Sequence, residues 1–342
     1  MSWEKEFASS ITRADQIFSP EQLPSPRLVE KYPIRVPRSV LKKINDTGSA
    51  ALARQFLPSD REMNIGGGHD DPIGDSAHFV APQLIHRYGN RALFMPTSVC
   101  PINCRYCFRK NELNSSVDFL KSEFDKTLQY LADHSEIEEI IFTGGDPLVL
   151  SNEKIQRFLE SFSQISSIKY IRFHTRTPIV IPSRVETQLV ELLEKYSQHF
   201  EQIVMVIHCN HSDEIDRSVR ESLARLPVNI KRLSQSVLLK GVNDSPECLE
   251  KLFRKLSSIG VTPYYLHHPD QAKGAMHFYL DLEQGRKIYG QLQNRLPGWM
   301  IPKYVIDIPG GHGKTPAYNP ETFEFSQTLL SKSGEKIPVS TP

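Results

Sequence analysis

The sequence predicts an α/β fold, a partial (β/α)6 barrel with a helical segment before it and a short C-terminal extension after it. From about residue 90, six strand-like apolar runs alternate with six helix-like stretches, an order that implies a parallel sheet with crossover helices. Six units fall short of the eight that close a barrel, so we expect the barrel to be open. Polar and reactive side chains follow consecutive strand-like runs, at the rim where strand–helix barrels build active sites.

The first 80 residues contain short helical patterns that prolines interrupt. They end in a polar patch, "NIGGGHDDPIGDS" at 64–76, whose glycines predict a loop. We therefore expect an N-terminal helical segment over residues 1–80.

The predicted barrel covers residues 81–300. Its strand-like runs lie at 91–96, 138–143, 169–174, 202–208, 234–239 and 263–268. Its helix-like stretches lie near 116–133, 152–164, 183–197, 212–226, 245–259 and 283–295. A seventh strand-like run, "KYVIDI" at 303–308, belongs to a C-terminal segment that we place at residues 301–342.

The composition is that of an ordinary soluble globular protein, with 24% charged and 39% hydrophobic residues. A formal net charge of +1 gives no reason to expect a nucleic acid or an anionic membrane as partner. The longest aliphatic run, at 203–207, is too short to span a bilayer. Because the N-terminus has acidic residues and no apolar core, we expect no signal peptide and a cytoplasmic location.

Three of the five cysteines lie within eight residues, in "CPINCRYC". In a reducing compartment such a cluster indicates metal or redox chemistry rather than disulfides. A [4Fe–4S] cluster held by three thiolates keeps one iron open to a small chelating molecule. The alternatives are a zinc knuckle completed by a distant histidine, although no second cysteine pair is present, or inert thiols.

A glycine-rich stretch near the C-terminus, "PGGHGKT" at 309–315, resembles a nucleotide-binding phosphate loop only in part. That motif needs a glycine six residues before Lys314, where Ile308 stands, and a helix after it. Pro316 and Pro320 prevent such a helix. From these residues alone, a flexible surface turn with an exposed lysine is the simpler interpretation.

The cysteine spacing resembles the signature of radical S-adenosylmethionine (SAM) enzymes, and "TGGDP" at 143–147 strengthens the resemblance. Further stretches are similar to the lysine 2,3-aminomutase family over roughly residues 70–320: "HRYGNRALF", "CRYCFR", "GGDPL", "RTPIVIP", "SQSVLLKGVND", "PYYLHHPD", "KGAMHF" and "GGHGKTP". The resemblance implies a radical SAM barrel with a [4Fe–4S] cluster, SAM and pyridoxal 5′-phosphate (PLP). It also implies an isomerase that moves an amino group between C2 and C3, converting L-lysine to β-lysine.

The resemblance also implies which residues hold the cluster and SAM. The implied cluster ligands are Cys100, Cys104 and Cys107. The implied SAM contacts are Gly144, Gly145, Asp146, His208 and Gln235. Glycines after the second strand let the backbone approach the cofactor, whereas Asp146 taken alone is equally consistent with a cap on the following segment.

Lys314 matches the family lysine that carries PLP as a Schiff base, which gives the neighbouring glycines a use. The implied PLP pocket also contains Arg91 as a phosphate contact, with Arg87 and Tyr88. The implied substrate contacts are Arg109 for the carboxylate and Asp270 and Asp307 for the terminal ammonium. The alternatives are that the three arginines form a solvated basic rim and that the two aspartates face solvent.

Some features depart from the family. Its longer members join subunits through a C-terminal extension with zinc-binding cysteines, but no cysteine follows Cys248 here and Ser245 stands where those members carry another. Structural zinc is therefore not expected, and a homo-oligomer stays possible. The chain length is closer to the branch that makes β-lysine for elongation factor P, whereas "DIPGGHGKTP" is closer to the branch that acts on free lysine.

The implied partners are an amino-acid substrate and a reductase or an electron donor of the flavodoxin or ferredoxin type. Arginine is an alternative substrate. Two other interpretations stay open from the sequence: a radical SAM enzyme without PLP, and a non-catalytic metal-binding module.

Overall fold

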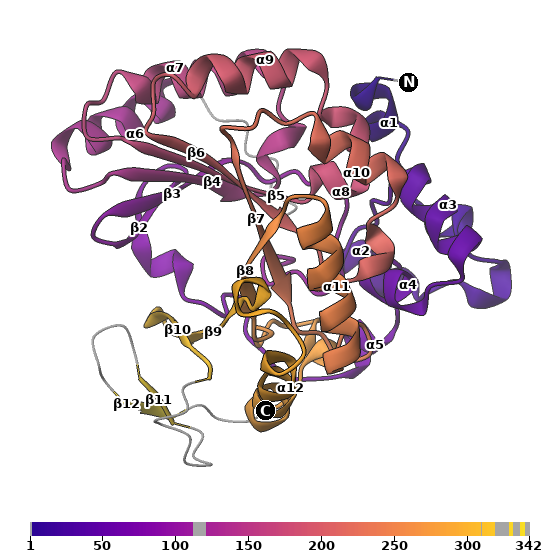
Figure 1. The fold of residues 1–342 in the computed structure, drawn as a ribbon. Coiled ribbons are helices and arrows are strands. Elements are labelled where there is room, and N and C mark those ends of the chain that lie inside the picture. Colours follow the sequence, from indigo (N-terminus) through magenta and orange to yellow (C-terminus); the bar gives the residue numbers. More distant parts are fainter. Residues whose placement is uncertain (1, 112–120, 309, 319–327, 331–335, 339–342) are drawn as a thin grey trace.

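The computed structural model describes residues 2–111, 121–308, 310–318, 328–330 and 336–338. Its centre is a ten-stranded sheet whose strands follow one another in sequence order from β1 to β10 (Figure 1). The strands are β1 (Phe79–Ala81), β2 (Leu84–Tyr88), β3 (Arg91–Thr97), β4 (Glu139–Gly144), β5 (Tyr170–Thr175), β6 (Gln202–His208), β7 (Lys231–Val237), β8 (Thr262–His267), β9 (Lys303–Ile308) and β10 (Gly313–Pro316).

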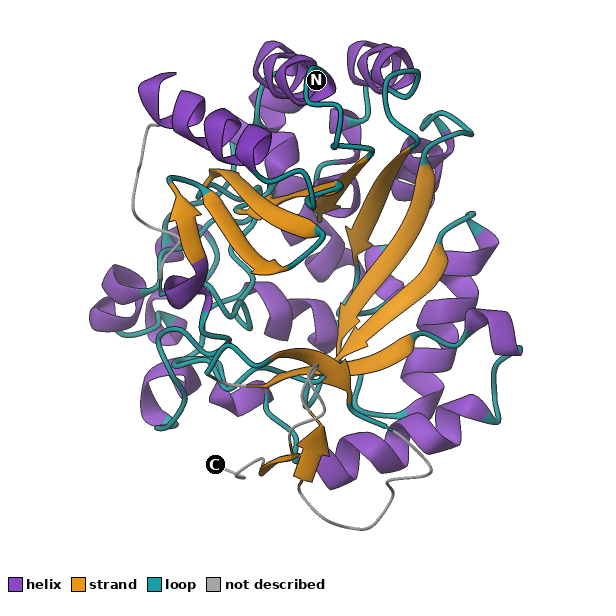
Figure 2. Cartoon of the chain, turned by 90° about the vertical axis from the view of Figure 1, so that its left-hand side faces the viewer, coloured by secondary structure: helices purple, strands orange, loops and turns teal. Residues whose placement is uncertain are grey.

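Strands β3 to β9 are all parallel to one another. Antiparallel strands flank them, β1 and β2 at one edge and β10 at the other. The sheet is curved but not closed, since β1 and β10 are its two ends (Figure 2). The prediction of a partial α/β barrel is therefore confirmed.

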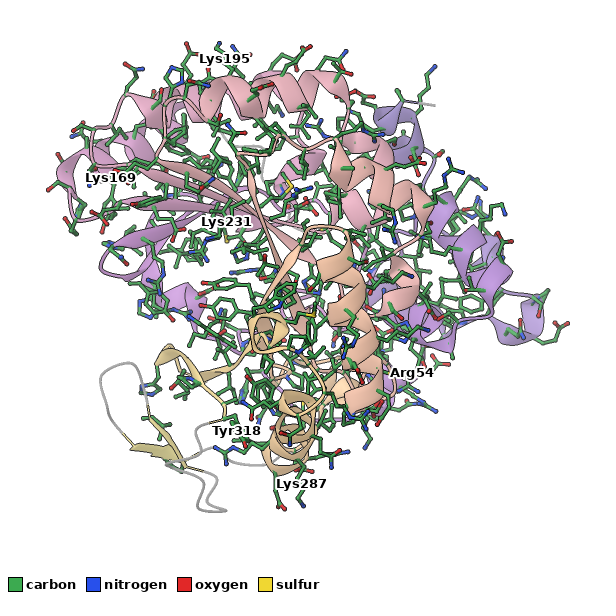
Figure 3. All side chains as sticks on the ribbon, viewed as in Figure 1. Arg54, Lys169, Lys195, Lys231, Lys287 and Tyr318 are labelled. Atoms are coloured by element: carbon green, nitrogen blue, oxygen red, sulfur yellow. The ribbon has the colours of Figure 1, made fainter. Side chains whose placement is uncertain are left out.

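Six helices connect the parallel strands and lie along the outer side of the curve (Figure 2). They are α6 (Lys121–Asp133), α7 (Asn152–Ser163), α9 (Thr187–Tyr196), α10 (Arg217–Ala224), α11 (Pro246–Ser258) and α12 (Leu282–Gln293). Helix α11 shows why they form: the Ser245 side chain caps its first turn, and Leu249, Leu252, Phe253 and Leu256 bury one face. The opposite faces are polar, and Lys195 on α9 and Lys287 on α12 project outward (Figure 3).

The described part of the N-terminal segment contains five short α-helices: α1 (Trp3–Ala8), α2 (Pro26–Lys31), α3 (Arg38–Thr47), α4 (Ala50–Phe56) and α5 (Arg61–Asn64). Pro26 and Pro37 stand at helix starts, where their fixed φ is tolerated. One hydrophobic core joins this segment to the barrel, from Trp3 to Ala317. The proposed boundaries at residues 80 and 300 stay predictions.

The core is richest in aromatic rings between β3, β4 and the helices behind them. Phe94 is fully buried, and its ring lies 5.0–5.7 Å from the rings of Phe124, Phe142, Phe158 and Phe162. This packing holds β3 in place, and β3 leads into the segment with the three clustered cysteines, residues 100–107, called the cysteine segment below.

The prediction for β7 was wrong in its limits, because the strand covers Lys231–Val237 and not 234–239. Two charged residues, Lys231 and Arg232, open the strand and conceal it from a hydrophobic pattern. The strand ends where the Asn243 side chain donates to the Val237 carbonyl at 2.9 Å and accepts from the Leu239 amide at 2.7 Å. Asn243 lies beyond the strand, so the hydrophobic pattern of the strand itself does not indicate where it ends.

The C-terminal segment adds β9 and β10 to the sheet, and β11 (Thr328–Leu330) pairs with β12 (Lys336–Pro338) as a separate ribbon. Pro309 of the glycine-rich stretch, the first residues of the predicted helix near 116–133 and much of 319–342 lie outside the described residues. Among the residues that are described, no helix is long and apolar enough to cross a membrane.

Candidate active site

A cavity of about 1010 Å³ lies inside the curve of the parallel strands. Every site residue predicted from the sequence lines it. They are Arg87, Tyr88, Arg91, Cys100, Cys104, Cys107, Arg109, Gly144, Gly145, Asp146, His208, Gln235, Asp270, Asp307 and Lys314. These residues come from eight strands and the loops beside them, so the fold brings together side chains that are more than 200 positions apart.

The three clustered cysteines follow β3 and are half-buried at the cavity wall. The amide of Cys107 donates to the Cys104 carbonyl at 3.2 Å, and Arg176 Nη1 donates to Cys104 Sγ at 3.4 Å. Burial raises the pKa of all three thiols, that of Cys107 to about 12. The thiols therefore need a bound cation to become thiolates, which is what an iron–sulfur cluster provides.

Among the described side chains, no three histidine, cysteine or acidic residues converge tightly enough to hold a single metal ion. A four-iron cluster differs, because each thiolate binds a separate iron. Three thiols on one short segment that lines a large cavity fit such a cluster, and Cys100, Cys104 and Cys107 would hold it.

A buried ion-pair network holds the cysteine segment from behind. Arg105 donates to the Glu62 carboxylate through Nε at 2.9 Å and Nη2 at 2.6 Å, and Lys110 Nζ reaches the same carboxylate at 2.7 Å. Glu62 lies in α5, and its side chain is fully buried. No sequence pattern pointed to this partner, because Glu62 lies about 40 residues before the cysteines in a short helix without a motif.

The glycine pair after β4 packs against the start of the cysteine segment. The amide of Gly145 donates to the Thr97 carbonyl at 2.7 Å, and that of Asp146 donates to the Val99 carbonyl at 2.9 Å. A Cβ on Gly145 would lie 2.3 Å from the Val99 carbonyl oxygen, which no side chain can do. Glycine is therefore required here by the protein's own backbone, besides any approach to a cofactor.

The Asp146 carboxylate is engaged by the chain itself. It accepts hydrogen bonds from the amides of Leu148, Arg176 and Thr177 at 2.7–3.0 Å and from the Thr175 hydroxyl at 2.7 Å. Four donors match the capacity of a carboxylate. Its side chain therefore acts as a cap on the short helical turn that follows.

His208 and Gln235 are paired by register on β6 and β7, and both face the cavity. His208 Nε2 lies 2.9 Å from the Tyr106 hydroxyl, and the two rings are stacked. Burial lowers the pKa of His208 well below its ordinary value, so its imidazole is neutral at physiological pH. Tyr106, between two cysteines, also contacts Arg176 after β5, so it connects both β5 and β6 to the cysteine segment.

Lys314 extends into the same cavity from β10, not into bulk solvent. Its Nζ lies 3.4 Å from Asp307 Oδ2 on the paired strand β9 and 5.2 Å from the centre of the Tyr265 ring. The Lys314 amide donates to the Tyr88 hydroxyl at 2.7 Å, and the Arg91 guanidinium lies 3.9 Å from the centre of the Tyr88 ring. An amine near an acid, with arginines close by, fits a phosphate-bearing aldehyde bound at this place.

Asp270, after β8, faces Asp307 across the cavity. Burial, followed by the charge of Asp307, raises the pKa of Asp270 to about 8. A carboxyl whose pKa is raised by burial and by a second acid nearby is stabilised in its ionised form by a bound cation.

The structure shows one site residue that the sequence interpretation missed. Asp75, in the polar glycine patch, is buried and forms ion pairs with both Arg87 and Arg109. Nothing in the patch distinguished Asp75 from its acidic neighbours. His174, at the end of a strand-like run, was expected at the shared site without a role of its own. It lines the cavity, burial lowers its pKa well below the ordinary value, and its Nε2 has no partner within the described part of the chain.

Comparison with known proteins gives the family. A model of the radical SAM superfamily matches residues 94–267. An L-lysine 2,3-aminomutase of Escherichia coli (strain K12) is 36% identical over 324 residues, which cover 92% of this chain and 94% of that protein. A putative L-lysine 2,3-aminomutase of Aquifex aeolicus is 42% identical, covering 83% of this chain and 77% of its own, and the L-lysine 2,3-aminomutase of Clostridium subterminale is 32% identical, covering 84% and 67%.

Among solved structures, the chain is similar to Streptococcus suis SuiB bound to S-adenosylmethionine, with a TM-score of 0.43 and 14% identity over 62% of this chain and 45% of SuiB. A likeness at this level adds nothing to the assignment. The superfamily match and the extended identity to the aminomutases decide it. The chain therefore belongs to the radical SAM superfamily and, within it, to the lysine 2,3-aminomutase family.

Proposed function

We propose that this chain is an isomerase that interconverts L-lysine and β-lysine by moving the amino group between C2 and C3. One observation supports this above all: the half-buried acids Asp270 and Asp307 line the same cavity as the Lys314 amine, which lies 3.4 Å from Asp307, and three thiols line that cavity too. A lysine substrate carries an ammonium for the two acids and an amine that can exchange with Lys314. A rival enzyme without PLP has no use for a buried lysine at this place.

In the proposed reaction, the [4Fe–4S] cluster and SAM supply hydrogen-atom abstraction, and PLP supplies the carbonyl that holds the migrating nitrogen. We assign Cys100, Cys104 and Cys107 as the cluster ligands. We assign the backbone of residues 144–146 and the side chains of His208 and Gln235 as the SAM contacts.

The Lys314 amine would hold PLP, and Arg91, Arg87 and Tyr88 would surround its phosphate and ring. Tyr88 is well placed to support both ends of this pocket, because its hydroxyl accepts from the Lys314 amide while Arg91 lies on its ring. The stacked guanidinium keeps its planar donors in a fixed orientation, which suits a phosphate.

Substrate recognition in this proposal uses the two ends of lysine. Asp270 and Asp307 bind the terminal ammonium, and the Arg109 guanidinium binds the carboxylate by paired hydrogen bonds. Glutamate or alanine has no terminal ammonium for the two acids, so either would lose this charge-assisted interaction. Arginine also carries a cation and is the amino acid to compare directly.

The test is an anaerobic assay of the reconstituted protein with lysine, arginine, glutamate and alanine, with the products identified by chiral chromatography. Conversion of lysine to β-lysine is the expected result. Turnover of another amino acid with none of lysine would overturn the substrate assignment. A protein that binds zinc and does not cleave SAM would instead be a non-catalytic metal-binding module.

The Lys314→Ala variant tests the PLP assignment separately. We expect it to lose the absorbance of bound PLP and at least about 10³-fold in turnover, the scale on which covalent and general acid–base groups act, while iron content stays unchanged. Unchanged turnover would support a radical SAM enzyme that does not use PLP.

We also propose a flavodoxin- or ferredoxin-type protein or its reductase as the electron donor, because cluster reduction needs a low-potential partner. A cytoplasmic location is proposed for the same reason, since free thiols and reduced clusters require a reducing compartment. A homo-oligomer is compatible with this proposal but is not required by it.

A further inference from the structure

The polar glycine patch at 64–76 is not an independent loop. It packs between the loop after β8, which carries Asp270, and the glycine loop that leads to Lys314. The His69 amide donates to the Gln271 carbonyl at 2.8 Å, and the Lys273 amide donates to the His69 carbonyl at 3.0 Å. Gly74 has φ +69°, and a Cβ there would lie 2.6 Å from the Gly311 amide nitrogen. Residues 66–78 therefore lie against both the loop after β8 and the glycine loop before Lys314.

This segment places one carboxylate inside the site. Asp71 accepts hydrogen bonds from the amides of Asp75 and Ser76 at 3.0 and 2.9 Å, which fixes the turn at that point. The Asp75 side chain, 2% exposed, then bridges two arginines: Oδ1 contacts Arg87 Nη2 and Oδ2 contacts Arg109 Nη2. Arg87 Nη2 also donates to the Ile73 carbonyl at 2.9 Å, so the segment holds this arginine at two points.

The contacts of Asp75 with both arginines offset an electrostatic cost. The Arg87 and Arg109 side chains are 6% and 5% exposed. Two buried guanidiniums repel each other, and the Asp75 carboxylate that both contact offsets this repulsion. A guanidinium presents five N–H donors, so one arginine can serve two carboxylates. Asp75 can therefore hold Arg109 in a fixed orientation while a ligand carboxylate binds the same arginine.

We propose that Asp75 is a positioning residue of the amino-acid site, which orients Arg109 toward the substrate carboxylate and anchors it to Arg87 on the cofactor side. This inference depends on the proposed function, since it needs a substrate with a carboxylate at Arg109. Asp75 acts through the two arginines and does not itself contact the reacting atoms. Recognition of the substrate carboxylate then depends on the N-terminal segment as well as on the barrel.

The experiment compares two ligands on the PLP-loaded protein, with affinity measured from the change in PLP absorbance. L-Lysine has the carboxylate, and pentane-1,5-diamine has both amines without it. We expect Asp75→Asn to weaken lysine binding about tenfold or more, as loss of one partner of a buried charge pair does. Binding of the diamine is expected to change by less than about twofold, because it makes no contact with Arg109.

Asp75→Glu keeps the charge but moves it by one methylene, so the ratio of lysine to diamine affinity should fall in the order wild type, Asp75→Glu, Asp75→Asn. Asp70→Asn is the matched control, because Asp70 lies on the same segment, is 68% exposed and pairs only with Lys273 among the described residues. This control should leave both affinities unchanged. If Asp75→Asn does not fold, the ratio for Asp75→Glu decides the question.

An unchanged ratio in the Asp75 variants would overturn this inference alone, provided that the wild type converts lysine to β-lysine. Equal weakening of both ligands would also overturn it, by showing a general structural role. Failure of the wild type to bind lysine at all would overturn the proposed function and this inference together.

Discussion

At the scale of single residues, the site combines three acids with three basic side chains. The acids are Asp75, Asp270 and Asp307, and the bases are Arg87, Arg109 and Lys314. Asp75 pairs with both arginines, whereas Asp270 is protonated at pH 7 because its pKa is raised to about 8. The terminal ammonium of a lysine substrate favours the ionised form of Asp270, so the site suits a diamino acid better than a neutral one.

The raised pKa of Asp270 predicts proton release when lysine binds. The folded-state pKa lies near 8, above the ordinary value of 3.8, so the free protein holds this proton at pH 7. An ammonium beside the carboxylate favours the ionised form and lowers the pKa again. Lysine binding at pH 7 should therefore release nearly one proton from Asp270, and lysine affinity should rise with pH up to about 8.

Calorimetry in buffers of different ionisation enthalpy measures that proton. The control ligand is 2-aminohexanoate, which has the same α-amine and carboxylate but no terminal ammonium. We expect lysine to release about one proton more than 2-aminohexanoate at pH 7 and no more than it at pH 9. If lysine and 2-aminohexanoate release the same number of protons at pH 7 as well as at pH 9, Asp270 does not bind the ammonium.

The chemistry-bearing residues of the site were largely predictable, and its internal partners were not. Cys104, His208, Asp307 and Lys314 were identified from sequence motifs, and they all line one cavity, although their individual roles stay predictions. Asp75 was missed because its role comes from a contact with arginines 12 and 34 positions away, and such contacts leave no local pattern.

At the scale of elements, the decisive contact is between the turn after β4 and the cysteine segment after β3. The two backbones approach so closely at Gly145 that the glycine limits where the thiols can lie. The position of the cysteines therefore depends on the neighbouring strand as much as on their own spacing.

Gly145→Ala tests this dependence. A methyl group 2.3 Å from the Val99 carbonyl oxygen must displace the cysteine segment, at a cost of about 1–3 kcal/mol in folding stability, as for overpacked sites. After anaerobic reconstitution, iron content should fall to less than about half of the wild-type value, together with the melting temperature. Gly298→Ala serves as control, because a Cβ there meets no atom within 4 Å, and normal iron content in Gly145→Ala would refute the argument.

Element prediction succeeded where hydrophobic alternation was strong, as in β4 to β6 and in the helices that follow them. It failed at β7, where Lys231 and Arg232 belong to the strand but are charged. It also did not predict what the patch at 64–76 packs against, because Gly74 contacts Gly311, more than 200 residues later. Propensity describes a segment in isolation, and these two features depend on what the segment packs against.

At the scale of the whole molecule, a single hydrophobic core supports both the barrel and the N-terminal helices. Phe94, which contacts the other rings of its aromatic cluster, lies six residues before Cys100 in the chain. We expect Phe94→Ala to lower the free energy of unfolding by about 3–5 kcal/mol, the usual cost of removing a buried ring.

Denaturant titration of the cluster-free protein measures this loss without interference from iron. Val228→Ala is the control, since Val228 is 93% exposed and its truncation should change stability by less than about 0.5 kcal/mol. A loss below about 1 kcal/mol for Phe94→Ala would mean that the ring cluster adds little to folding.

The order of the sheet also bears on how the protein is made. Because each strand from β1 to β10 pairs with its successor in the chain, the sheet can be extended one strand at a time as the polypeptide leaves the ribosome. The cysteine segment is translated more than 200 residues before Lys314, so the strands around the thiols can pair before the lysine that would hold PLP is made. Gly74 can pack against Gly311 only after that, so the N-terminal segment reaches its final place late in folding.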